Sequence, residues 1–130
     1  MNSINTPVSP GEVLDKITIL EIKAVKISDN GKLKNINHEL KLLQSIWNTH
    51  VESSDEVDAL KQQLKKVNQD LWNIEDDIRI KEYKKEFDDE FIQIARSVYV
   101  ENDKRAAAKK ALNLLLGSEL VEEKSYEDYS

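Results

Sequence analysis

The sequence contains no cysteine. This absence excludes a disulfide framework, a thiolate metal site and a cysteine nucleophile, and it fits the reducing environment of the cytoplasm. No apolar run approaches the ~20 residues that a membrane-spanning helix needs. Residues 1–9 also lack the basic and apolar regions of a signal peptide. We therefore expect a soluble, cytoplasmic protein with no membrane partner.

An excess of positive charge is missing as well. The formal net charge is −6, although 34% of the residues are charged. No basic block interleaved with aromatic residues occurs along the chain, whereas proteins that hold duplex DNA neutralise its phosphates with many lysine and arginine side chains. We expect no nucleic-acid partner, and we interpret the charges as solvated faces of helices.

Glycine and proline, the residues that mark turns, are scarce, with three and two copies in 130 residues. Few turns mean long helices. A chain of this length is typical of one domain and can bury a core without disulfides or metals. We predict a single helical domain over residues 1–130, with a loose N-terminal arm at residues 1–8 and an acidic C-terminal tail at residues 118–130, which is frayed unless Lys124, Tyr126 and Tyr129 order it against the body.

What the chain does contain is apolar residues at spacings of three and four, the pattern of amphipathic helices. The first of these helices has a clear start, because Ser9, Pro10 and Glu12 match a capping box with proline at the first helical position. The most regular pattern is a three-heptad stripe that predicts a helix continuing to about Glu82. The stripe consists of Val57, Leu60, Leu64, Val67, Leu71, Ile74 and Ile78.

The C-terminal part allows two interpretations. Asp88 can cap a helix, but the apolar pattern breaks at residues 101–103. Either Asn102 or Asp103 caps a fifth helix, or the fourth helix continues through this segment until Gly117 stops it. In both cases, four or five amphipathic helices with short connectors predict an all-α helical bundle.

One face of the third predicted helix is not explained by its apolar stripe. Trp72, Glu75, Asp76 and Arg79 lie at positions i, i+3, i+4 and i+7 and therefore share this face. An indole ring can stack on a flat ligand, two carboxylates can hold a cation, and an arginine can bind phosphate. The structural alternative is that Trp72 packs on a neighbouring helix and that Glu75 pairs with Arg79 on the surface.

Two further groups of polar residues lie at helical spacing. Glu12, Asp15 and Lys16 open the first helix, where acidic residues are favoured by the helix dipole and by capping. Functionally, Glu12 and Asp15 share a face and could supply oxygen ligands to a metal. The second group is Asn102, Arg105, Lys109 and Asn113, with Asp103 beside its start. It is either a solvated helix face or a basic stripe that meets an anionic ligand.

Several separated segments together resemble a known family. They are residues 9–23 (SPGEVLDKITILEIK), 67–79 (VNQDLWNIEDDIR), 87–99 (FDDEFIQIARSVY), 102–105 (NDKR), 117–118 (GS) and 122–126 (EEKSY). They resemble a small family of unknown function from bacteria and phages, often encoded near glycosyltransferase or surface-polysaccharide genes. The resemblance implies no established activity. It suggests a role near sugar-nucleotide or polysaccharide metabolism.

We consider two main functional hypotheses. The first is a helical binding or interaction module, either a homo-oligomer or bound to a protein partner, because the Trp72 face and the broad apolar surface of the first helix exceed the needs of one core. An accessory protein without a small-molecule ligand is a weaker form of this hypothesis. The alternative is an enzyme or sensor that binds a nucleotide or nucleotide sugar with Mg²⁺ or Mn²⁺.

The alternative assigns a role to each polar residue. Its ligand-binding residues are Trp72, Arg79, Asn102, Arg105 and Lys16. Its metal ligands are Glu75, Asp76, Asp15, Glu12 and Asp103. Helical nucleotide pyrophosphohydrolases offer a loose analogy, since they hold magnesium with paired acidic residues on facing helices. The adjacency of Glu75 and Asp76 departs from that pattern, because neighbouring residues point about 100° apart around a helix.

Overall fold

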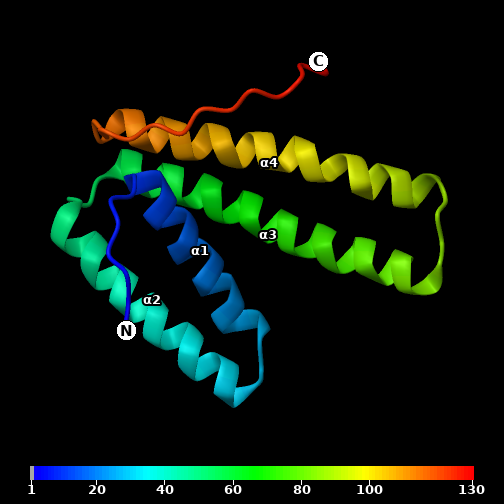
Figure 1. The fold of residues 1–130 in the computed structure, drawn as a ribbon, viewed down its shortest axis with the longest axis horizontal. Coiled ribbons are helices and arrows are strands. Elements are labelled where there is room, and N and C mark those ends of the chain that lie inside the picture. Colours follow the sequence, from blue (N-terminus) through cyan, green and yellow to red (C-terminus); the bar gives the residue numbers. More distant parts are fainter. Residues whose placement is uncertain (1) are drawn as a thin grey trace.

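A computed structural model describes residues 2–130 and shows four helices connected by short turns (Figure 1). They are α1 (Pro10–Lys26), α2 (Asn30–His50), α3 (Asp55–Lys84) and α4 (Asp89–Leu115). No strand occurs in residues 2–130. The predicted all-α bundle is confirmed, and within the described residues no helix is long and apolar enough to cross a membrane.

Side-chain caps define where the helices begin. As predicted, the Ser9 side chain accepts a hydrogen bond from the backbone N–H of Glu12, and Asp88 accepts one from Phe91. Asp29 and Ser54 cap α2 and α3 in the same way. Each cap satisfies a backbone donor that has no partner within the helix, which is why these short polar residues fix the helix starts.

The fourth helix is continuous. Residues 100–104 lie inside α4, so the second of our two interpretations is correct and no fifth helix forms. The end of the helix is set by Gly117, whose φ of 65° is costly for other residues. The backbone N–H of Ser118 donates to the carbonyl of Asn113 at 2.8 Å, which closes the turn as in a Schellman motif.

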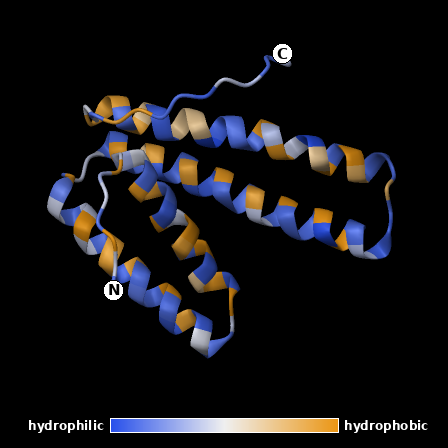
Figure 2. Cartoon of the chain, in the orientation of Figure 1, coloured by the Kyte–Doolittle hydropathy of each residue, from blue (hydrophilic) through white to orange (hydrophobic). Residues whose placement is uncertain are grey.

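The helices form two hairpins, α1–α2 and α3–α4, which diverge from each other in Figure 1. Helix α1 is central because it packs against all three other helices, and within residues 2–130 no other helix backbone lies close to α2. The broad apolar surface of α1 follows from this position. Figure 2 shows hydrophobic residues recurring along all four helices, as expected for amphipathic helices that share one core.

The core lies where α1 crosses the α3–α4 hairpin. It contains Leu14 of α1, Val57 and Leu64 of α3, and Ala108 and Leu112 of α4, and Trp47 from the end of α2 packs against it. No residue from 69 to 107 is buried. The far half of the α3–α4 hairpin therefore extends beyond the core, and the wedge between this half and α1 holds the candidate site.

Candidate functional site

A buried polar cluster joins three helices at the base of the site. Asp15 of α1 is 1% exposed, and its carboxylate accepts hydrogen bonds from Arg105 of α4 through both oxygens, with Nε to Oδ1 at 2.9 Å and Nη2 to Oδ2. Asn68 of α3 donates to the same Oδ1 at 2.9 Å and to the Thr18 hydroxyl at 3.0 Å. Because a buried carboxylate is costly without partners, these bonds fix how the three helices cross.

The cluster holds opposite charges. Burial raises the pKa of Asp15, but the hydrogen bonds from Arg105 and Asn68 and the charges of Arg105 and Lys109 outweigh this effect, so the pKa lies below its usual value. The hydrogen bond to Asp15 raises the pKa of Arg105. Both groups are therefore charged at neutral pH. The Arg105 side chain nevertheless remains 32% exposed.

The start of α1 is pressed against α4. The backbone N–H of Gly11 donates to Asn113 Oδ1 at 2.7 Å, and a Cβ atom at Gly11 would lie 2.7 Å from the carbonyl oxygen of Lys109. Only glycine fits this close approach of α1 to α4. The same approach places the Glu12 carboxylate 2.9 Å from Lys109 Nζ.

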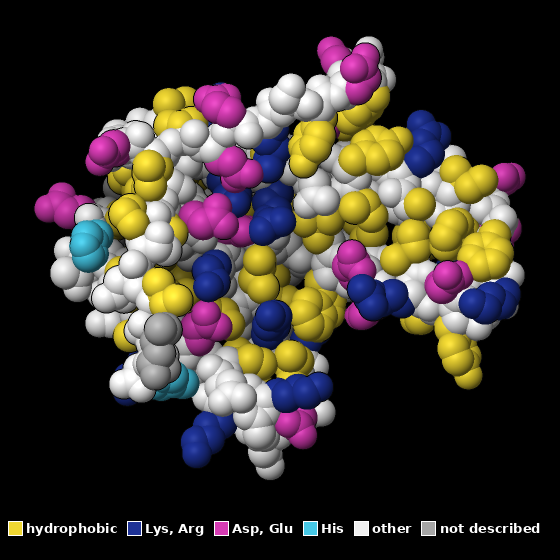
Figure 3. All heavy atoms as spheres, viewed as in Figure 1, with side chains coloured by type: hydrophobic (Ala, Val, Ile, Leu, Met, Phe, Trp, Pro, Cys, Tyr) yellow, Lys and Arg dark blue, Asp and Glu magenta, His cyan; other side chains and the backbone are white. Residues whose placement is uncertain are grey.

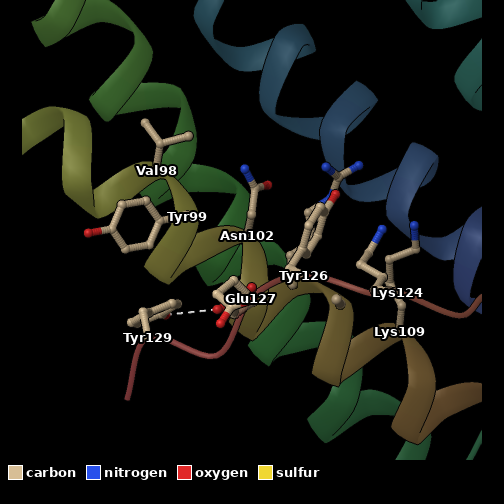
Figure 4. A pocket seen from close by; sticks show the side chains of 11 residues that line it. Val98, Tyr99, Asn102, Lys109, Lys124, Tyr126, Glu127 and Tyr129 are labelled. Atoms are coloured by element: carbon tan, nitrogen blue, oxygen red, sulfur yellow. Dashed lines mark hydrogen bonds between the residues drawn. The ribbon is translucent and has the colours of Figure 1, made fainter.

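The first hollow of the site, which we call the tail pocket, lies between α4 and the C-terminal tail, residues 118–130. It has a volume of about 600 Å³. Figure 4 shows Tyr99 and Asn102 on α4, and Tyr126 and Tyr129 on the tail, bordering the same space. The polar and aromatic side chains that line the pocket include Tyr99, Asn102, Arg105, Lys109, Lys124 and Tyr126.

The tail is positioned by a small number of contacts. The Tyr129 hydroxyl donates to Asp103 at 2.8 Å, and the Tyr129 ring meets the Tyr99 ring edge to face at 4.9 Å. The bond to Asp103 raises the pKa of Tyr129. Glu122 of the tail lies 3.8 Å from Lys109 Nζ. These contacts are on the surface, so the tail is held more weakly than the helices.

The second hollow, which we call the Trp72 hollow, lies between α1, α3 and α4 and has a volume of about 510 Å³. The structure brings together Trp72, Glu75, Asp76 and Arg79 in this hollow. Arg79 Nε also donates to Glu75 at 3.1 Å, as the structural alternative expects. Val98, Asn102 and Arg105 line both hollows, so the two adjoin along α4.

The charge of this region differs from that of the whole chain. Basic side chains slightly outnumber acidic ones among the residues that line the two hollows, in a chain of net charge −6. Figure 3 shows basic side chains gathered in the middle of this face, with hydrophobic side chains beside them. The combination of aromatic rings with a few fixed polar groups is typical of small-molecule sites.

The remaining predicted site residues do not come together in one hollow. Lys16 lines neither hollow and pairs with Glu39 of α2 at 3.3 Å. Glu12 pairs with Lys109, Asp15 is enclosed by Arg105 and Asn68, and Asp103 accepts from Tyr129. Within residues 2–130, no three His, Asp or Glu side chains come together as a metal site would require. The structure thus does not assemble the five expected metal ligands.

Sequence reasoning missed one contributor to the site and left a second one open. Asn68 stands between Val67 and Leu71 of the apolar stripe. This position beside core residues could have indicated that the Asn68 side chain is buried. The sequence left open whether Lys124, Tyr126 and Tyr129 order the tail, and these residues form one wall of the tail pocket. Their signal was two tyrosines in a segment that is otherwise acidic.

Comparison with known proteins identifies a family. No curated protein matches the chain, and no solved structure matches it. A family of unknown function, DUF6165, matches residues 4–129, which is nearly the whole chain. The protein belongs to this family of unknown function (DUF6165).

Proposed function

We propose that this protein is a binding module for a small, polar, ring-bearing ligand carrying a phosphate, such as a nucleotide sugar, and that the ligand occupies the tail pocket and the adjoining Trp72 hollow. The observation that carries the proposal is the position of Arg105. Its guanidinium group is fixed by the buried Asp15 and borders both hollows.

A fixed arginine is a favourable anion-binding group. Its planar fork is pre-organised for a phosphate, and because Asp15 already holds the side chain, little conformational freedom is lost on binding. Asp15 uses the Nε and Nη2 donors of Arg105, which leaves Nη1 to reach a ligand. Asn102 stands one turn away on α4 and lines the same two hollows.

The two hollows suit the two ends of such a ligand. The indole of Trp72 offers a flat surface for a base, and the carboxylates of Glu75 and Asp76 can accept hydrogen bonds from ribose hydroxyls. Tyr99 and Tyr126 offer ring faces and hydroxyls for a sugar in the tail pocket. A phosphate link between the two ends would then lie beside Arg105.

The gene neighbourhood of the family that the sequence resembles also supports this ligand class. The family that the sequence resembles is often encoded near glycosyltransferase or surface-polysaccharide genes in bacteria and phages, so sugar nucleotides of the cytoplasm are natural candidates. The expected homo-oligomer is a separate proposal that does not depend on the ligand.

Binding is favoured over metal-dependent catalysis because the acidic residues that we expected to hold a metal do not meet at one point in the described residues. Asp15, the most buried carboxylate, already has both oxygens engaged by Arg105 and Asn68. A metal held by Glu75 or Asp76 would need the phosphates of a bound ligand to complete its coordination. Metals are therefore a variable in a ligand screen.

The test is a thermal-unfolding and calorimetry screen with nucleoside phosphates, nucleotide sugars and hexose phosphates, each with and without Mg²⁺ or Mn²⁺. A ligand present at 100 times its dissociation constant stabilises the folded state by about 2.7 kcal/mol, which corresponds to roughly 10 °C for a domain of this size. We expect such a shift for a phosphate-linked sugar compound without added metal.

Variants locate the binding. We expect Trp72→Ala and Tyr126→Ala each to raise the dissociation constant about tenfold, the loss of one stacking contact. Lys34→Ala, an exposed α2 variant away from both hollows, serves as the control and should bind as the parent does. A flat screen with folded protein would refute the proposal. A shift that requires metal and vanishes in Asp76→Asn would instead establish the metal-dependent alternative.

A further inference from the structure

Three basic side chains line the tail pocket: Arg105 and Lys109, one turn apart on α4, and Lys124 of the tail. Figure 4 shows the amino groups of Lys109 and Lys124 close together. Both amino groups contact the same carboxylate, that of Glu122, so they are neighbours in space. Like charges that lie so close repel each other, and this part of the pocket therefore needs carboxylates or a bound anion to compensate them.

The first helix compensates only part of this positive charge. Glu12 lies 2.9 Å from Lys109 Nζ, and Asp15 lies 3.8 Å from the same atom while it binds Arg105. Both carboxylates are fixed, because the start of α1 is pressed against α4. Three basic groups thus face two carboxylates of α1, and one positive charge has no partner on a helix.

The third carboxylate comes from the tail. Glu122 accepts a hydrogen bond from Lys124 at 2.6 Å and lies 3.8 Å from Lys109 Nζ. The hydrogen bond from Lys124, together with the charges of Lys124, Lys109 and Arg105, lowers the pKa of Glu122, so this group is ionised at neutral pH. Within residues 2–130, it is the only other carboxylate at ion-pair distance from these three basic groups.

Glu122 is also the carboxylate that can move. It lies in the tail, outside any helix, and its side chain is 53% exposed. The 3.8 Å separation from Lys109 is too long for a hydrogen bond, and exposed ion pairs contribute little to stability. Glu122 lines a hollow of about 530 Å³ that shares Lys109 and Lys124 with the tail pocket, so its carboxylate lies at the edge of that pocket.

We propose that Glu122 holds the position of the ligand's phosphate in the unbound protein, and that the phosphate displaces this carboxylate when the ligand binds. The inference rests on the proposed function for the identity of the ligand, and it adds how the phosphate position is kept when no ligand is present. A phosphate group carries more negative charge than a carboxylate and offers three acceptor oxygens, so it can satisfy Lys109 and Lys124 more fully than Glu122 does.

The tail then has two opposing effects on binding. Lys124 and Tyr126 form a wall of the pocket, and Lys124 Nζ lies 5.9 Å from the centre of the Tyr126 ring. Glu122 competes with the ligand for the same basic groups. Because the Glu122 side chain is exposed, it can rotate away while the wall stays in place. Removing the whole tail and removing this single carboxylate should therefore change the affinity in opposite directions.

Calorimetric titration with inorganic pyrophosphate, without added metal, tests the proposal. Glu122→Gln should lower the dissociation constant about fivefold, because a surface ion pair no longer has to be broken. The matched control is Glu123→Gln, which removes the same charge from the next residue. The Glu123 carboxylate lies 3.9 Å from Lys110, outside the group of three, so this control should change the affinity by less than about twofold.

A double-mutant cycle shows whether Glu122 acts through its contact with Lys124. In Lys124→Gln protein the carboxylate has lost its main partner, so adding Glu122→Gln should change the dissociation constant for pyrophosphate by less than about twofold. Equal gains in Glu122→Gln and Glu123→Gln would overturn the proposal, because a general loss of negative charge would explain them. Unchanged affinity in Glu122→Gln, or no pyrophosphate binding by either this variant or the parent protein, would also overturn it.

The result also separates this inference from the proposed function. A flat screen of nucleotide sugars, together with tighter pyrophosphate binding by Glu122→Gln, would refute the proposed ligand and support the anion position that Glu122 holds. Binding of a nucleotide sugar with the same affinity in Glu122→Gln and the parent protein would support the proposed function and refute the role of Glu122.

Discussion

Replacing Asp15 by asparagine is the sharpest test of how this fold is held together. The change keeps the shape of the side chain and removes its charge, so Arg105 loses an ionic partner while the packing around it persists. Removing one partner of a fully buried ion pair costs about 3–5 kcal/mol. Arg105 keeps about a third of its side chain in water, with 32% exposed, and can recover part of its hydration. We therefore expect a loss of about 2–3 kcal/mol.

The assay is thermal and urea unfolding at pH 7. A loss of this size should lower the melting temperature by roughly 7–12 °C for a domain of this length. The control is Glu75→Gln, which removes the carboxylate of an exposed i,i+4 pair with Arg79 and should cost no more than about 0.5 kcal/mol. If Asp15→Asn unfolds within a degree of the parent protein, the buried pair does not determine the crossing of α1, α3 and α4.

The pH dependence gives the same prediction a second readout. Because the pKa of Asp15 is lowered in the folded state, its carboxylate stabilises the fold fully above the unfolded-state pKa, near 3.9. This contribution is lost as the pH falls through the folded-state pKa. The stability gap between the parent protein and Asp15→Asn should therefore be constant from pH 7 to about pH 5 and should shrink below pH 4. A gap that stays constant down to pH 2 would contradict the lowered pKa.

Three other changes have defined outcomes. Gly11→Ala puts a methyl group 2.7 Å from the carbonyl oxygen of Lys109 and strains the bond to Asn113, so the urea midpoint should fall by the equivalent of about 1–3 kcal/mol, and an unchanged midpoint would contradict the close approach. Ending the chain at Ser118 should leave the melting temperature within a few degrees of the full chain while abolishing ligand binding measured by calorimetry, because the tail has only surface contacts. Lys81→Gln should lower the melting temperature at low salt and much less at high salt, because Glu86, Asp88 and Glu90 converge on this ammonium group within 3.3 Å, and an equal effect at both salt concentrations would refute the electrostatic cause.

The helices were predictable because their signals are local. A cap such as Ser9 or Asp88 acts within one turn, and the stripe of α3 repeats through residues that contact the same neighbour. The choice between four and five helices was not decided by local signals, because Asn102 and Asp103 are good caps by themselves. Asn102 instead lines both hollows and Asp103 lines the tail pocket, where it accepts from Tyr129, and the helix continues beneath them.

The site was less predictable because its key partners are far apart in the chain. Asp15 and Arg105 are 90 residues apart, and Asp15 and Asn68 are 53 apart. A sequence pattern shows that Asp15 lies on a helix, but it does not show that this face meets α3 and α4. Asp15, which the sequence suggested as a metal ligand, instead forms a buried charge pair with Arg105, because spacing along one helix does not show which side chains of other helices it meets.

The central position of Arg105 determines how stability and binding can be separated. Any change of Arg105 removes the partner of a buried carboxylate, so a loss of ligand binding in such a variant would have two indistinguishable causes. Trp72 and Tyr126 border the hollows without contributing to the buried cluster, so their variants report on binding at nearly unchanged stability. Asp15→Asn provides the opposite case, since it frees Arg105 from its fixed position while leaving the charge of the guanidinium group intact. If pre-organisation of Arg105 matters for phosphate binding, Asp15→Asn should weaken phosphate-containing ligands more than their dephosphorylated analogues, and equal weakening of both would show that the arginine serves the fold alone.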